Sequence, residues 1–294
     1  MNCPVCNSKN KKKIFETSKV TKYVAEYQPS RRKALDYPFV KVSFVECKNC
    51  MFLYNQNYVQ LDYKVKHDTN RSYSKIFNNY LKFVIKFLKN KINTNEIDNI
   101  LEVGFGDGKF LSKLSKTNQF KKKKFYGFDP SYKKNFSIKN CKLSNRYYDK
   151  KIKVKPNLVV VRHTLEHISK VKPFLNKILH ENPKYIFVEI PCKSYVYQYN
   201  YHYFSGEHCS YFDEYSLQLL LKKFNYKKIK MLKRFNKENL LAIFVKSNNK
   251  TKIKISKKNQ LSFKSKNFHM NDFKNFKKKI FKKINFNKDF IWGA

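Results

Sequence analysis

Three of the six glycines in this chain of 294 residues lie within five positions, at Gly104, Gly106 and Gly108. An apolar run at residues 100–103 precedes them, and a stretch with helical spacing follows at residues 109–116. Glycine adopts positive φ angles and has no Cβ, so a strand, a glycine loop and a helix in this order let the backbone approach a ligand closely. The loop therefore predicts a site for a nucleotide-like ligand.

The spacing around the loop distinguishes between two such ligands. A dinucleotide fold usually carries Gly-x-Gly-x-x-Gly, whereas this chain has Glu-x-Gly-x-Gly-x-Gly, beginning at Glu102. An acid at this position suits the cationic amino-acid part of S-adenosylmethionine better than a pyrophosphate. Asp129 ends the next predicted strand, where its carboxylate can accept hydrogen bonds from two ribose hydroxyls. We expect Glu102, Phe105, Asp129 and the three glycines to bind S-adenosylmethionine; the alternative is a tight structural turn followed by a solvated aspartate.

Titratable side chains also follow the predicted strand at residues 158–161. Arg162 and His163 come directly after this strand, at the edge where ligands of open α/β sheets collect, so we expect both to contact the cofactor. His167 stands four residues further on and is a candidate for proton transfer, since an imidazole titrates near neutral pH. We expect the intervening Glu166 to act as a carboxylate at the start of a helix.

Two Cys-x-x-Cys pairs, Cys3 with Cys6 and Cys47 with Cys50, stand about 40 residues apart. This spacing lets two thiolates on one tight turn face the same metal ion, and four thiolates close the coordination shell of a structural zinc ion. In a cytosolic chain such pairs indicate zinc rather than disulfides; the alternative is four reduced cysteines. We expect the remaining cysteines to be packing residues: Cys141, Cys192 and Cys209.

The elements that must position these residues alternate between strands and helices. Apolar spacing predicts helices at residues 74–90, 109–116, 173–180 and 215–223, and strands at 39–46, 100–103, 125–128, 158–161, 185–190, 229–235 and 240–245. The alternation predicts an α/β fold whose parallel sheet is covered on both faces, with an antiparallel final pair. We expect a zinc-binding domain at residues 1–70, an S-adenosylmethionine-binding domain at 71–248, and a basic linker with a helix at 249–294.

The composition limits the class of function. The chain has 64 Lys and Arg against 21 Asp and Glu, a formal net charge of +43, which by itself suggests nucleic acid or an anionic membrane as partner. The lysines are spread along the chain, so we expect solvated faces that favour acidic substrates rather than a dedicated nucleic-acid interface. No apolar run approaches the roughly 20 residues of a membrane-spanning helix, and we identify no signal peptide. These features predict a cytoplasmic protein without a membrane partner.

Four stretches together resemble a known family. They are the two cysteine pairs, residues 101–108 (LEVGFGDG), residues 159–168 (VVVRHTLEHI) and residues 206–217 (GEHCSYFDEYSL). The chain resembles the class I S-adenosylmethionine-dependent methyltransferases, and more narrowly the sugar C-methyltransferases with an N-terminal zinc-binding domain. The resemblance implies a Rossmann-like, seven-stranded methyltransferase sheet. The family's C-terminal domain opens on a strand and a Gly-Ala turn, as residues 291–294 do, so we expect a truncated C-terminal domain.

The resemblance also implies a catalytic centre. Glu207 and His208 match the family's catalytic Glu-His pair, and His167 matches a further histidine of the centre. A family tyrosine upstream of the glycine loop is matched by Tyr73, with Tyr80 as the competing match.

The activity that the resemblance implies is C-methylation of a nucleotide-linked keto sugar through an enolate. We expect His208 to remove the proton α to the ketone, His167 to stabilise the enolate oxygen, and Glu207 to orient one imidazole; the exchange of the two histidine roles is the alternative. Ser205 stands where the family has a tyrosine, two residues before the Glu-His pair. The alternatives are O- or N-methylation of another small molecule, a basic protein that binds or modifies RNA, and a cofactor-binding protein without activity.

Overall fold

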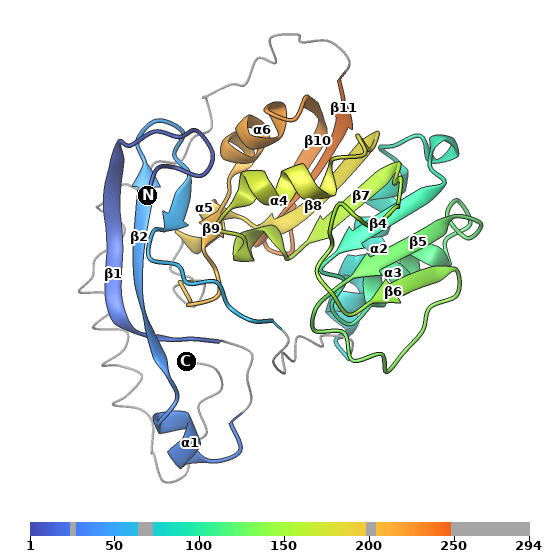
Figure 1. Ribbon diagram of the computed structural model, residues 1–294. Helices are drawn as coiled ribbons and strands as arrows, with labels where there is room; N and C mark the ends of the chain where they lie inside the picture. Colours follow the sequence, from blue (N-terminus) through green and yellow to red (C-terminus); the bar gives the residue numbers. More distant parts are fainter. Residues whose placement is uncertain (24–27, 64–72, 198–203, 248–294) are drawn as a thin grey trace.

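A computed structural model describes residues 1–23, 28–63, 73–197 and 204–247 of the protein. These residues form a seven-stranded sheet with helices on both faces and a separate four-stranded sheet from the N-terminal part of the chain (Figure 1). The linker, helix and strand expected at residues 249–294 lie outside the described residues.

The large sheet has the strand order β10-β11-β8-β7-β4-β5-β6. Its strands, in chain order, are β4 (Asn99–Val103), β5 (Lys124–Phe128), β6 (Cys141–Ser144), β7 (Leu158–Arg162), β8 (Tyr185–Pro191), β10 (Tyr226–Arg234) and β11 (Asn239–Lys246). The pairs from β6 through β8 are parallel, and β11 is antiparallel to both β8 and β10. The expected α/β fold with an antiparallel final pair is therefore confirmed.

The central strands are buried along nearly their whole length, as expected for strands covered on both faces. All seven residues of β8 are buried, and so are the first four of β7. The strand β4 lies between β5 and β7, so the chain order reverses at β4. Ligands of open α/β sheets bind beyond the carboxyl ends of the strands at such a reversal, which is where the glycine loop begins.

Four helices cover the two faces of the large sheet: α2 (Lys75–Lys89), α3 (Lys109–Ser115), α4 (Val171–Ile178) and α6 (Glu214–Lys222). The short helix α1 (Arg31–Leu35) has no buried residues and lies at the end of β1 and β2, away from this sheet (Figure 1). The remaining short elements are α5 (Lys193–Val196) and the 3-10 turns η1 (Thr94–Glu96) and η2 (Leu165–His167). Buried residues of α2 and α3 pack with Ile100 and Val160 on one face, whereas those of α4 and α6 pack with Leu101 and Val161 on the other. Successive strand residues point to opposite faces, so each strand supplies both cores.

The small sheet is antiparallel, in the order β1-β2-β3-β9. Its strands are β1 (Lys11–Thr21), β2 (Phe39–Cys47), β3 (Leu53–Asn55) and β9 (Ser210–Tyr211). The last strand comes from the segment after β8, so residues far from the N-terminus complete this sheet. The strand β1 was not expected from the sequence, because KKKIFETSKVT is mostly polar and lacks regular alternation.

A buried lysine joins the two sheets. Lys193 of α5 is fully buried, lies 2.8 Å from an Asp213 carboxylate oxygen and donates to the backbone carbonyl of Met51, next to the second cysteine pair. Asp213 in turn caps α6 through Ser216. The cysteine-bearing turn is therefore tied directly to the segment that follows β8. None of the helices in the described part of the chain is long and apolar enough to span a membrane.

Candidate functional site

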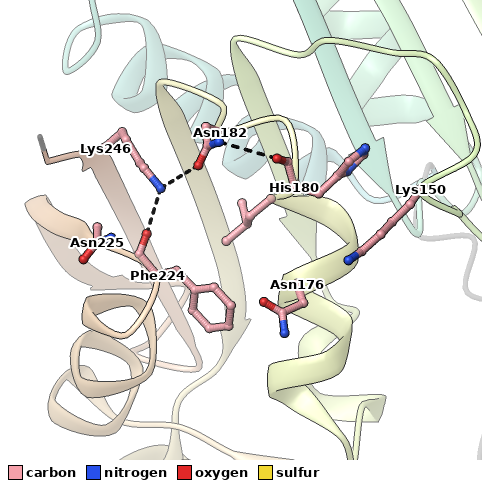
Figure 2. Close-up of a pocket in the computed structure, with 8 residues that line it drawn as sticks. Lys150, Asn176, His180, Asn182, Phe224, Asn225 and Lys246 are labelled. Carbon is pink, nitrogen blue, oxygen red and sulfur yellow. Dashed lines mark hydrogen bonds between the residues drawn. The ribbon is translucent and has the colours of Figure 1, made fainter.

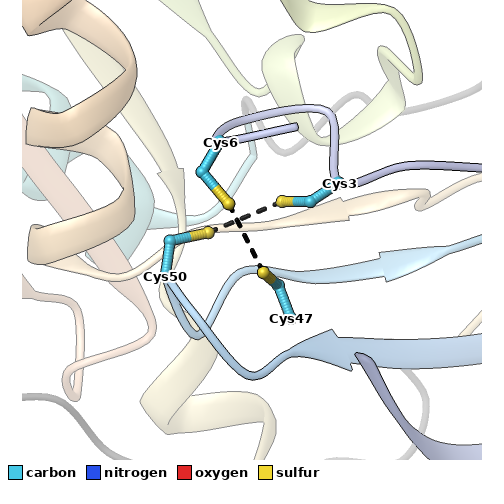
Figure 3. A group of neighbouring side chains, drawn as sticks. All are labelled: Cys3, Cys6, Cys47 and Cys50. Carbon is cyan, nitrogen blue, oxygen red and sulfur yellow. Dashed lines mark hydrogen bonds between the residues drawn. The ribbon is translucent and has the colours of Figure 1, made fainter. Parts of the chain in front are cut away.

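The four paired cysteines meet in one cluster (Figure 3). The Sγ atoms of Cys3 and Cys50 are 3.5 Å apart, as are those of Cys6 and Cys47, and all four Sγ atoms lie within 4.8 Å of one another. A tetrahedral zinc ion with Zn–S bonds of about 2.3 Å places its sulfurs about 3.8 Å apart. The donor set and its spacing therefore fit zinc.

The two cysteine turns share one backbone geometry. The amide of Asn7 donates to the Cys3 carbonyl at 2.9 Å, and the amide of Met51 donates to the Cys47 carbonyl at 2.8 Å. Asn7 and Met51 each follow the second cysteine of a pair and adopt positive φ angles of 66° and 59°. This repeated turn directs both thiols of each pair to the same point. Because three of the four cysteines are almost fully buried, the cluster has the enclosed character of a structural metal site.

The glycine loop begins at the carboxyl end of β4, and its glycines have different surroundings. Gly104 has a φ of +77°, and a Cβ there would lie 2.1 Å from Thr164 Oγ1. Gly106 has a φ of +55°, and none of the described residues places a heavy atom within 4 Å of the position that a Cβ would take there. The sequence predicts that both glycines border the ligand path. The space beside Gly104 is instead filled by protein, whereas the space beside Gly106 is open.

Asp129 lies beside this loop, as its position at the end of β5 predicts. One of its carboxylate oxygens accepts a hydrogen bond from the Gly106 amide at 2.8 Å, and the other accepts from the amide and hydroxyl of Ser131. Phe105 packs edge-to-face against Tyr132, with 5.2 Å between ring centroids. The carboxylate therefore links the glycine loop to the start of the next loop, at the sheet edge where a ribose is expected.

Glu102 is buried on β4 with an incompletely satisfied carboxylate. Its Oε1 lies 4.0 Å from Arg162 Nη1, and its Oε2 has no hydrogen-bond partner among the described residues. Burial raises the pKa of Glu102 to about 8, although the Arg162 guanidinium opposes the shift. Arg162 also donates from Nε to Glu189 Oε2 at 2.5 Å and lies over the Phe110 ring. Glu102 therefore offers a buried carboxyl group that a cationic ligand would ionise.

Glu189, at the end of β8, connects the residues that follow β7. It is fully buried and lies 3.2 Å from His163 Nε2, and the hydroxyl of Tyr80 donates to it at 2.6 Å. Burial opposes its ionisation, but Arg162 and His163 together hold the pKa of Glu189 well below its usual value. Sequence analysis did not single out this residue, although it lies near the end of the strand predicted at residues 185–190. Of the two tyrosines that could match the family tyrosine, Tyr80 is buried beside Glu189, whereas Tyr73 is 95% exposed.

His163 lies between two carboxylates. Its Nδ1 is 3.5 Å from Glu166, on the side opposite Glu189. Burial disfavours a charged imidazole here, but the hydrogen bonds to Glu166 and Glu189 outweigh it and raise the pKa of His163 to about 9. The residue also has a positive φ of 46°, a conformation that non-glycine residues rarely adopt and that is concentrated at functional sites. The imidazole of His163 therefore links the carboxylate of Glu189 on β8 to the carboxylate of Glu166 in η2.

The two catalytic candidates His167 and His208 face each other, with ring centroids 4.8 Å apart. His167 Nδ1 lies 3.2 Å from the backbone carbonyl of Glu207 and 3.0 Å from the hydroxyl of Tyr63. Burial lowers the pKa of His167. A carbonyl only accepts hydrogen bonds, so Nδ1 carries the proton and Nε2 holds the lone pair of the neutral ring. Tyr63 was not expected at the site, since it lies in an irregular segment without periodicity.

Glu166 belongs to the same cluster. It lies in the first turn of η2, is 2% exposed, and its Oε2 has no hydrogen-bond partner among the described residues. One ligand atom from each of Glu166, His167 and His208 lies within 4.8 Å of the others. Ser205, at the position of the family tyrosine, is buried and accepts a hydrogen bond from the His208 amide at 3.2 Å.

A separate cavity of about 280 Å³ lies near the amino-terminal end of the parallel strand β8, away from the glycine loop (Figure 2). It is bordered by the residues that precede β8 and β10 and by the end of the antiparallel β11, with Lys246 donating to Asn182 and to the Phe224 carbonyl. Its lining is Lys150, Asn176, Leu179, His180, Asn182, Phe224, Asn225 and Lys246. The glycine loop lies at the carboxyl ends of the parallel strands, so this cavity is not part of the candidate active site.

The sequence profile of a family described as a methyltransferase domain matches residues 68–231, which is more than half of the chain. The chain belongs to this methyltransferase domain family. Together with the fold and the glycine loop, this membership makes the protein an S-adenosylmethionine-dependent methyltransferase. No curated protein sequence matches the chain.

Several solved methyltransferase structures are similar to part of the chain. The methyltransferase domain of bacterial CtHen1 is 19% identical, covers 58% of this chain and 99% of its own, and has a TM-score of 0.44. Human N-acetylserotonin methyltransferase in complex with SAM is 13% identical, with coverages of 59% and 53% and a TM-score of 0.49. The N-methyltransferase NodS from Bradyrhizobium japonicum is 13% identical, with coverages of 60% and 99% and a TM-score of 0.43.

Proposed function

We propose that the enzyme transfers the methyl group of S-adenosylmethionine to a carbon atom of a nucleotide-linked keto sugar. The observation that carries this proposal is the meeting of His167 and His208, 4.8 Å apart between ring centroids, close to the carboxyl ends of β7 and β8. Two imidazoles at one point suit a reaction that removes a proton from carbon and stabilises the resulting oxyanion. The high net positive charge, +43, favours an acidic nucleotide-linked acceptor.

The cofactor is proposed to lie over the glycine loop. The open space beside Gly106 admits the ligand, Asp129 faces its ribose, and Glu102 receives its ammonium group. Phe105, Gly104 and Gly108 shape the loop, and Arg162 and His163 border the ligand from the end of β7. When bound, S-adenosylmethionine supplies the electrophilic sulfonium methyl group.

The chain's own residues then move one proton. We assign removal of the α-proton to His208 and stabilisation of the enolate oxygen to His167, with Glu207 holding His167 Nδ1 through its backbone carbonyl. The enolate carbon forms a bond to the methyl group, and the sulfur keeps the electrons of the broken S–CH₃ bond. In this assignment His167 donates to the enolate oxygen from Nε2 and must therefore carry a proton on both ring nitrogens. The neutral ring has its lone pair on Nε2, so the exchange of the two roles, with His167 as base and His208 as enolate stabiliser, is the alternative assignment. The side chain of Tyr73 is 95% exposed, whereas Tyr80 is buried and donates a hydrogen bond to Glu189. We therefore assign the position of the family tyrosine to Tyr80.

The domain organisation is part of the proposal. We infer that residues 1–70 form a module around a structural zinc ion bound by Cys3, Cys6, Cys47 and Cys50, and that residues 71–248 bind the cofactor. The contact between Lys193 and Met51 supports a structural role, because it holds the cysteine turn against the methyltransferase sheet.

The decisive experiment is incubation of the full chain with S-adenosylmethionine and a nucleotide-linked keto sugar. The expected product is heavier by one methyl group, and nuclear magnetic resonance places that group on carbon next to the ketone. Methyl groups found only on oxygen or nitrogen would refute C-methylation and favour a different small-molecule acceptor. A gel shift that persists in rising salt would instead favour the RNA alternative, since nonspecific charge binding fades steeply with salt.

A further inference from the structure

We propose that zinc binding at the four-cysteine cluster sets the position of His208, and that Lys193 is the positioning residue that couples the two sites. The inference rests on the zinc ion of the proposed function but does not depend on the sugar acceptor. Its basis is a continuous chain of contacts from the second cysteine turn to the segment that follows His208. Figure 1 shows α5, which begins with Lys193, and β9 at the junction of the two sheets.

The ammonium group of Lys193 makes the first contact. Its Nζ donates to the Met51 carbonyl and lies 2.8 Å from an Asp213 carboxylate oxygen, and the side chain is fully buried. Met51 directly follows Cys50, and its amide closes the turn by donating to the Cys47 carbonyl at 2.8 Å. The position of the Met51 carbonyl therefore depends on the turn that carries two of the four thiols.

A short β-ladder makes the second contact. The strand β3 follows the second cysteine turn and pairs with β9 over two residue pairs. The amide of Asn55, at the end of β3, donates at 3.0 Å to the carbonyl of Cys209, the residue next to His208. The amide of Cys209 in turn donates at 2.8 Å to the Glu166 carbonyl in η2. The segment beside His208 is therefore held between β3 and the turn that carries His167.

Residues that follow β3 also contact His167. The hydroxyl of Tyr58 donates to the His167 backbone carbonyl at 3.2 Å, and the hydroxyl of Tyr63 lies 3.0 Å from His167 Nδ1. Both tyrosines belong to the N-terminal part of the chain, together with the four cysteines. The cysteine-bearing part of the chain therefore supports both candidate catalytic histidines, His167 through these two phenols and His208 through β3.

Removal of zinc releases this chain of contacts at its first step. The ion cross-links the two cysteine turns, and a metal that binds only the folded arrangement of its ligands stabilises that arrangement. When the second turn loosens, the Met51 carbonyl leaves Lys193, and a buried ammonium group that loses a partner is costly. A ladder of two residue pairs is too short to persist without the turn that leads into it. The segment that follows His208 then loses its support.

The cofactor site lies outside this chain of contacts. The glycine loop and Asp129 follow β4 and β5, which β7 separates from β8 in the strand order of the sheet. None of the contacts described for Lys193, Met51 and β9 involves β4 or β5. Zinc should therefore affect the position of His208 without affecting the affinity for S-adenosylmethionine.

The test is hydrogen–deuterium exchange of the full-length protein with zinc bound and after its removal by a chelator, with zinc content measured by atomic absorption. We expect the peptides that contain Asn55 and Cys209 to exchange roughly tenfold faster without zinc, and the dissociation constant of S-adenosylmethionine to change by less than about threefold. Unchanged exchange in both peptides, or loss of S-adenosylmethionine binding together with the zinc, would overturn the inference. A protein that binds no zinc would overturn it together with the zinc assignment.

Lys193→Met tests the coupling itself. The variant keeps all four cysteines and should bind zinc, but its Cys209 peptide should exchange rapidly even with zinc bound, and zinc removal should change that rate by less than about twofold. Lys246→Met is the matched control, because Lys246 also donates to a backbone carbonyl, that of Phe224, in the cavity near the amino-terminal end of β8. It should respond to zinc as the wild type does. A tenfold response to zinc in Lys193→Met would refute Lys193 as the coupling residue.

The double variant Lys193→Met with Asp213→Asn is the second variant, in case Lys193→Met does not fold, because it removes both buried charges and keeps an N-cap residue for α6. Thermal melting and S-adenosylmethionine binding establish that each variant is intact. Formation of C-methylated product by a protein whose exchange does not respond to zinc refutes the coupling and leaves the proposed function standing. A response to zinc without any C-methylated product supports the coupling and refutes the sugar proposal.

Discussion

The substitution Gly106→Ala separates cofactor binding from folding. Gly106 has a φ of +55°, and a Cβ at this position meets none of the described residues within 4 Å. Alanine in this left-handed conformation costs about 1–2 kcal/mol, which lowers the melting temperature by roughly 2–8 °C for a domain of this size. The variant should therefore fold. Its new methyl group extends into the open space that we assign to S-adenosylmethionine.

The loss of affinity follows from that overlap. Forcing one methyl group against a closely packed ligand costs about 1.4–2.8 kcal/mol, which corresponds to a roughly 10- to 100-fold higher dissociation constant. Isothermal titration calorimetry with S-adenosylmethionine measures the affinity, and thermal melting without ligand measures stability. Wild-type affinity in folded Gly106→Ala protein would refute the assignment of this space to the cofactor.

Gly104→Ala is the matched comparison on the same loop. A Cβ there lies 2.1 Å from Thr164 Oγ1, whose hydroxyl is within hydrogen-bonding distance of the Val103 and Arg162 carbonyls. Strain at positive φ, overpacking and the disturbed hydrogen bonds together predict a loss of roughly 3–6 kcal/mol in stability. Adding Thr164→Ala should restore part of that stability, since it removes the closest atom. A Gly104→Ala protein as stable as the wild type would contradict this packing of Thr164 against the loop.

Three further outcomes are expected. His208→Ala should keep S-adenosylmethionine binding and lose turnover; near-full activity in a methyl-transfer assay would rule out His208 at the reacting centre. Cys47→Ser should lose the bound zinc, measured by atomic absorption, and melt at a lower temperature, whereas Cys141→Ser, outside the cluster, should keep both properties unchanged. Since burial raises the pKa of Glu102 to about 8, this carboxyl is protonated at pH 7 in the free enzyme. A cationic ligand favours its ionised form, so affinity should rise with pH up to about 8 and binding should release a proton. Calorimetry in buffers of different ionisation enthalpy measures that release, and an equal pH slope in Glu102→Gln would exclude Glu102 as the source.

Local patterns determined the elements of the sheet with good accuracy. The helix expected at residues 74–90 is α2 (Lys75–Lys89), and the strand expected at 185–190 is β8 (Tyr185–Pro191). The helix has apolar residues at helical spacing, and the strand has a nearly continuous apolar run. Both patterns can be recognised from residues that are close in the sequence. The strands β1 and β6 were missed, because their residues alternate weakly and their pairing partners stabilise them as strands.

The residue types and spacing of the proposed cofactor loop were evident without a structure: an acid, three closely spaced glycines and a second acid one strand later. It also determined the donor set of the cysteine cluster, since two Cys-x-x-Cys turns carry their geometry locally. In contrast, local patterns could not show that Gly106 rather than Gly104 borders open space, because Thr164, which fills the space beside Gly104, comes from the loop after β7. Only the tertiary structure brought Glu166 and His208 together, because their distance depends on the paths of two loops and not on their separation in sequence.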